Sequence, residues 1–70
     1  MATDGPKPMF VVKDSEAFSN PWLTYFYGQF LWGPDRDNAY RFSDREKALQ
    51  TGKAAMPSLS MSKRVVVEPA

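Results

Sequence analysis

Cysteine and histidine are both absent from this 70-residue chain. Disulfide bonds are therefore impossible, and so is a zinc site built from the usual cysteine and histidine ligands. The chain also lacks histidine as an acid–base catalyst and cysteine as a nucleophile. Asp35, Asp37 and Asp44 match no established cation-binding loop. We therefore expect a protein that is not an enzyme and that carries neither a metal ion nor another cofactor.

Long apolar runs and a strong net charge are missing as well. Nine Lys and Arg residues stand against eight Asp and Glu residues, for a net charge of +1, which is not the pattern of a protein held to nucleic acid mainly by phosphate contacts. No segment approaches the roughly 20 apolar residues of a membrane span, and the first ten residues lack the apolar stretch of a secretory signal. We expect a complete small protein in the cytoplasm, without a membrane partner.

The short length predicts one domain. A chain of this size buries only about 60% of its unfolded surface, so without disulfides or a metal it depends on a compact core, on oligomerisation or on a partner. Two prolines and a glycine in residues 1–8 predict a flexible N-terminal arm. The expected domain is residues 9–70.

Aromatic residues, by contrast, are concentrated: six of the ten lie within residues 22–32. The segment is either a hairpin with Tyr27 and Gly28 at its turn, where glycine supplies a positive φ, or one long strand with Gly28 as a bulge. We favour the hairpin, because eleven residues make a long strand for so small a domain. One face of that hairpin carries the four side chains that we expect under a helix: Leu23, Tyr25, Phe30 and Trp32.

A helix is predicted over residues 44–56. Ser43 as N-cap and Glu46 three residues later form a capping box, and Pro57 ends the pattern. The residues that recur at helical spacing are Ala48, Leu49, Gly52, Ala55 and Met56. We expect this stripe to face the sheet, and the position of Gly52 within it predicts close approach to a bulky ring.

Shorter segments complete the layout. Residues 9–13 and 64–68 predict the first and last strands, residues 33–37 a turn, residues 38–42 a short strand or extended lead-in, and residues 58–63 a polar connection. The order strand, hairpin, helix, strand predicts an α+β fold, in which one helix packs on one face of a small, mostly antiparallel sheet.

One helix covers only one face of such a sheet, so some large side chains should lie on the other face. Exposed apolar patches usually mark contact sites, and Trp and Tyr are favoured interface anchors. The alternative is that all the rings are core, since a small chain needs large apolar side chains. The predicted protein-binding residues are Trp22, Phe26, Tyr27, Leu31 and Arg36.

Binding of single-stranded nucleic acid is the alternative function. Aromatic side chains on a strand can stack on bases, but such strands normally carry Lys or Arg among the aromatics. Here no basic residue occurs between Lys13 and Arg36. The remaining basic residues are interleaved with acids, as on a solvated helix face.

Residues 32–49, WGPDRDNAYRFSDREKAL, resemble a pattern of small phage and prophage accessory proteins, in which an aromatic strand leads through an Asp-rich turn to an Ala-x-x-Phe step and a capped helix. The matching residues are Trp32, Asp35, Ala39, Phe42, Ser43, Glu46 and Ala48. The resemblance implies a protein-binding modulator or inhibitor of a host complex, such as RNA polymerase or a defence nuclease, acting in the host cytoplasm. It assigns a role to no single residue.

Overall fold

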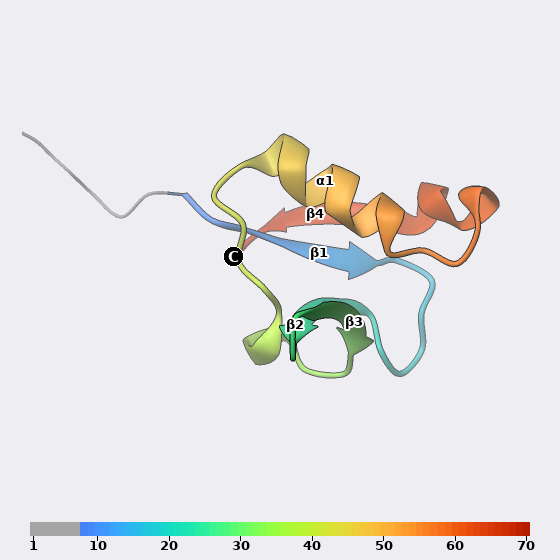
Figure 1. The fold of residues 1–70 in the computed structure, drawn as a ribbon, viewed down its shortest axis with the longest axis horizontal. Coiled ribbons are helices and arrows are strands. Elements are labelled where there is room, and N and C mark those ends of the chain that lie inside the picture. Colours follow the sequence, from blue (N-terminus) through green and yellow to red (C-terminus); the bar gives the residue numbers. More distant parts are fainter. Residues whose placement is uncertain (1–7) are drawn as a thin grey trace, which may run out of the picture.

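A computed structural model describes residues 8–70 of the chain, and in these residues the four strands form one antiparallel sheet in the order β3-β2-β1-β4. The α-helix packs on one face, so the predicted α+β fold is confirmed (Figure 1). Of the predicted arm, all but Pro8 lies outside the described residues. The elements are β1 (Phe10–Asp14), β2 (Trp22–Phe26), β3 (Gln29–Gly33), the 3-10 helix η1 (Arg36–Asn38), α1 (Arg45–Ala54), the 3-10 helix η2 (Leu59–Arg64) and β4 (Val65–Pro69).

The hairpin prediction is confirmed and the single-strand alternative is excluded. In the register of β2 and β3, Leu23 lies opposite Trp32 and Tyr25 opposite Phe30. Tyr27 and the following glycine form the turn with φ values of 49° and 77°. Two successive positive φ angles are what a two-residue hairpin of type I′ requires.

Strands β1 and β2 pair only near Trp22, the first residue of β2, and then diverge. Residues 39–42 fill the opening between them. Ala39 forms a bridge to Thr24 on β2, and Phe42 forms one to Phe10 on β1 with two reciprocal 2.8 Å hydrogen bonds. The extended segment predicted over residues 38–42 is therefore a lead-in that joins the two halves of the sheet, except that Asn38 belongs to η1.

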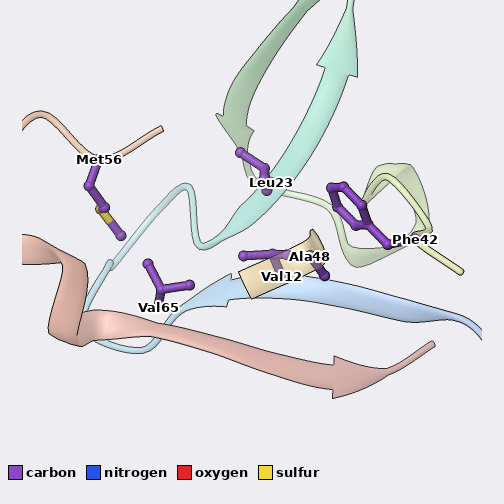
Figure 2. Packing of buried hydrophobic residues seen from close by; sticks show 6 residues of the cluster. All are labelled: Val12, Leu23, Phe42, Ala48, Met56 and Val65. Carbon is purple, nitrogen blue, oxygen red and sulfur yellow. The ribbon is translucent and has the colours of Figure 1, made fainter. Parts of the chain in front are cut away.

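The core lies between α1 and the strands β1 and β4, and Leu23 of β2 and Phe42 complete it (Figure 2). Its buried residues are Val12, Leu23, Phe42, Ala48, Met56 and Val65. Met56 is buried and Leu49 packs against this cluster, as predicted. A Cβ on Gly52 would lie 2.6 Å from Cγ1 of Val12 and 2.8 Å from Cγ1 of Val65. The predicted close approach exists, but two valines and not an aromatic ring make it.

The predicted capping box is wrong. Asp44, and not Ser43, is the N-cap: its Oδ1 accepts hydrogen bonds from the backbone N–H groups of Glu46 at 2.9 Å and Lys47 at 3.4 Å. Because α1 begins one residue later than Ser43 would require, Glu46 is the second helical residue and not the third, and it cannot close the box. Aspartate is as good an N-cap as serine, so the helix loses no capping strength by beginning after Asp44.

The connection between β3 and α1 and the connection between α1 and β4 each contain a short helix that was not predicted. The turn after β3 includes the 3-10 helix η1, and the connection after α1 includes the six-residue 3-10 helix η2. Within residues 8–70 no helix has both the length and the apolar character needed to cross a membrane.

Candidate protein-interaction surface

The hairpin has two faces, and α1 covers neither of them along its length. Side chains alternate across a strand, so Trp22, Phe26 and Leu31 share one face, which we call the outer face. Leu23 and Trp32 share the other face and reach the core. The helix lies along β1 and β4, whereas the hairpin is turned away from it (Figure 1).

Three large side chains near the turn are exposed. Phe26, Tyr27 and Leu31 retain 57%, 89% and 47% of their accessible surface, and we call them the outer hairpin patch. The Phe26 and Tyr27 rings meet edge to face, with centroids 4.3 Å apart. These rings therefore support each other and not the core. All three belong to the predicted binding residues.

The other two predicted binding residues lie together at the far end of β2. Trp22 is half-buried, and its ring is approached by two cations, since Lys13 Nζ and Arg36 Cζ each lie 5.4 Å from the ring centroid. Arg36 also donates a 2.7 Å hydrogen bond from Nη2 to the carbonyl of Pro69. The structure thus brings Trp22 and Arg36 together as a cation–π site. The Trp22 ring is therefore not an uncovered aromatic surface like those of Phe26 and Tyr27.

Tyr25 is placed differently from the prediction. Its side chain points to the predicted face, yet it is half-exposed and has no helix over it. Tyr40, from the segment between β2 and β1, lies beside it with ring centroids 5.5 Å apart, and Phe30 lies 4.9 Å away on the neighbouring strand. The reason is the divergence of β1 and β2, which carries this end of the hairpin out of reach of α1.

Sequence reasoning missed Tyr40 altogether. It is exposed, and it packs edge to face on the buried Phe42 with centroids 4.8 Å apart. The signal was present in the alternation of residues 39–42, which places Tyr40 and Phe42 on the same side of an extended segment. The exposed surface of the hairpin half is therefore larger than the outer hairpin patch.

A pocket of about 330 Å³ borders the patch at Phe26. Asp35 and Asn38 contribute charged and polar groups to its wall, and Thr24 and Tyr25 complete the hairpin side. The pocket places hydrogen-bonding groups beside an apolar patch, which is the combination that fixes the orientation of a bound group.

Among residues 8–70, the one buried charged side chain, Asp14, lies outside this surface. Asp14, at the end of β1, accepts hydrogen bonds from Arg64 Nε at 2.9 Å and Nη2 at 2.8 Å, and from the Glu16 amide at 3.1 Å. Burial raises the pKa of Asp14, but these hydrogen bonds and the Arg64 charge together outweigh burial and hold the pKa below its ordinary value. The pair joins β1 to the start of β4 and has no part in the outer hairpin patch.

Among residues 8–70 no three acidic side chains gather where they could hold a metal ion. A scan against models of protein families and comparisons with curated proteins and with solved structures find no match to this chain.

Proposed function

We propose that this protein is a non-catalytic protein-binding module and that the outer hairpin patch is its binding surface. The observation that supports this most is the exposure of Phe26, Tyr27 and Leu31, because the core takes its hairpin residues, Leu23 among them, from the opposite face. A small domain gains nothing in stability from leaving such side chains in water, whereas apolar patches with polar surroundings are typical of protein contact sites.

The surroundings of the patch suit a protein partner. Interfaces combine aromatic anchors at the centre with charged and polar groups at the rim. Here Asp35 and Asn38 line the adjoining pocket, and Arg36 is held over Trp22 at the other end of β2. These charges set the orientation of the partner and the rings supply contact area.

The resemblance of residues 32–49 to phage accessory proteins suggests the partner class. We propose a macromolecular complex of a bacterial host, such as RNA polymerase or a defence nuclease, with the protein acting in the host cytoplasm as a modulator or inhibitor. The partner is sought by capture from a nuclease-treated bacterial lysate and mass spectrometry, followed by binding measurements with the purified candidate.

The test of the surface compares two matched substitutions. Phe26→Ala removes a ring of the patch, and Phe18→Ala removes a fully exposed ring from the loop between β1 and β2. We expect Phe26→Ala to weaken partner binding at least about 10-fold, or 1.4 kcal/mol, with the fold retained by circular dichroism, and Phe18→Ala to leave the affinity unchanged. Equal affinities for the two variants would place the binding surface elsewhere.

One observation favours the second candidate function, binding of single-stranded nucleic acid. The sequence shows no basic residue within the aromatic segment, but the fold brings Lys13 and Arg36 to the ring of Trp22. Against this, the same two cations occupy the ring on which a base would stack. Binding to a single-stranded oligonucleotide would fall steeply with rising salt, whereas an aromatic protein interface would change little. Anisotropy at two salt concentrations, with wild type and Lys13→Ala, separates the two functions.

A further inference from the structure

Strand β3 is an edge strand with unused hydrogen-bonding groups. In a hairpin with a two-residue turn the residues next to the turn, here Phe26 and Gln29, form a hydrogen-bonded pair, and such pairs recur at every second position. Leu31 and Gly33 therefore also bond to β2. The N–H and C=O groups of Phe30 and Trp32 point away from the sheet, and no group in residues 8–70 bonds to them.

The opposite edge of the sheet is better protected than β3. On β4, Pro69 has no N–H and its carbonyl accepts the Arg36 hydrogen bond, while the Val65 N–H bonds to the carbonyl of Ser62. Proteins usually shield an edge with prolines, charges or covering segments. Between Gln29 and Gly33 the β3 sequence has neither a proline nor a charge.

We propose that β3 pairs with β3 of a second copy of this chain, antiparallel, about a two-fold axis at Leu31. In this register Phe30 of each copy lies opposite Trp32 of the other. Both residues present outward N–H and C=O groups, so the two pairs form four hydrogen bonds and use every free group on the edge. A two-fold axis presents the same surface twice, and β3 is self-complementary in this sense.

Neighbouring registers are worse for backbone reasons. An axis at Phe30 would place Trp32 opposite Gly28, which lies in the turn with a φ of 77°. An axis at Trp32 would place Phe30 opposite Pro34, which has no N–H to donate. An axis between two neighbouring residues would pair a residue whose N–H and C=O face outward with one whose N–H and C=O face β2, so their hydrogen bonds could not form. Only the axis at Leu31 satisfies all four groups on each copy.

The side chains agree with this register. Leu31 of one copy meets Leu31 of the other on the outer face, and on the opposite face each Phe30 meets a Trp32, the kind of aromatic cross-strand pair that stabilises sheets. No like charges face each other, because β3 carries none. A single strand pair buries little surface, so we expect a weak, reversible dimer. This dimer goes beyond the proposed function and rests on a separate observation, the backbone of β3.

The test is sedimentation equilibrium of the full chain without any partner, up to about 1 mM, the weak end of specific affinities. We expect wild type to change from monomer to dimer with concentration. Leu31→Lys and Leu31→Glu each place two like charges on the axis, so each variant alone should dimerise at least about 10-fold more weakly. Mixing the two variants should restore the dimer, because opposite charges then meet at the axis.

A backbone change tests the same edge without altering a side chain. In chemically synthesised chains, N-methylation of Trp32 removes one outward N–H of β3 and should abolish the dimer. N-methylation of Val67 removes an outward N–H of β4, at the other edge of the sheet, and should leave the dimer intact. Circular dichroism confirms that each chain folds. Three outcomes would overturn the proposal. The chain could stay monomeric at every concentration, the dimer could be unaffected by the Leu31 substitutions and by N-methylation of Trp32, or the chain could form oligomers larger than the dimer. Partner binding that survives N-methylation of Trp32 would leave the proposed function standing.

Discussion

The two halves of this molecule, the helix-covered half and the hairpin half, differ in an unexpected way: the half with fewer large aromatic residues is the more deeply buried. The half made of α1, β1 and β4 has few aromatic residues, yet Val12 and Ala48 are completely buried there. The hairpin half holds most of the large rings, and Phe26 and Tyr27 are mainly in water. The difference shows that a side chain is buried only where another element covers it. Small and β-branched side chains let α1 approach β1 and β4 closely, whereas aromatic rings on the hairpin have no covering layer and stay exposed.

Trp32 connects the two halves, so its removal should have the largest effect. It packs against the core cluster, and its Nε1 donates a 3.3 Å hydrogen bond to the carbonyl of Ala55, just after α1. We expect Trp32→Ala to lower the free energy of unfolding by about 3–5 kcal/mol, enough to unfold much of so small a domain. Urea denaturation measures this, and Tyr27→Ala, an exposed control, should change stability by less than about 0.5 kcal/mol. Similar losses for both would mean that the two halves are not joined at Trp32.

Arg64 supports only the helix-covered half. Its two hydrogen bonds compensate the charge of Asp14, which is buried, and removing one partner leaves the other charge buried and unpaired. We expect Arg64→Ala to lower the melting temperature at pH 7, and the exposed Lys63→Ala to leave it nearly unchanged. Thermal unfolding of both variants measures the difference.

The same pair gives the protein an acid-sensitive component of stability. Because the pKa of Asp14 is lower in the folded than in the unfolded chain, its contribution is complete above the unfolded pKa of about 4 and is lost as pH falls through the folded value. The deficit of Arg64→Ala relative to wild type should therefore shrink below about pH 4. A deficit that stays constant down to pH 2 would contradict this assignment.

Gly52 tests how tightly the covered half is packed. Alanine is favoured over glycine within a helix by about 1 kcal/mol, but its Cβ would overlap Cγ1 of Val12 and of Val65, and overpacking typically costs about 1–3 kcal/mol. The net effect expected for Gly52→Ala is a destabilisation of up to about 2 kcal/mol. Gln50→Ala, at an exposed position of α1, should be neutral or slightly stabilising. Stabilisation by Gly52→Ala would show that the interface between helix and sheet is looser than described.

The smallest effect separates the two adjacent cap residues. Asp44→Ala removes the two hydrogen bonds that begin α1 and should cost about 1 kcal/mol. Ser43→Ala removes a side chain that makes no cap bond in the described structure and should cost less than about 0.5 kcal/mol. The reverse order, measured by denaturation, would restore the capping box that the sequence predicted.

Local features of the chain were readable from sequence. Gly28 and the alternation around it predicted the hairpin and its register, because a positive φ and a period of two act over a few residues. The helix was predicted within about two residues at each end for the same reason, although Ser43 was predicted as its cap and Asp44 is the cap. The sequence also predicted that Phe26, Tyr27 and Leu31 would be exposed, but for a different reason, because α1 lies along β1 and β4 and does not cover the other face of the hairpin.

Only the tertiary structure decided where that helix lies. The insertion of residues 39–42 between β1 and β2 turns the hairpin away from α1, which leaves Tyr25 half-exposed and places Tyr40 beside it. It also took the fold to bring Arg36 and Lys13 to Trp22. These contacts join residues far apart in the chain, and no local propensity encodes them. The sequence by itself determined the elements and their alternating faces, whereas long-range packing determined which faces were covered.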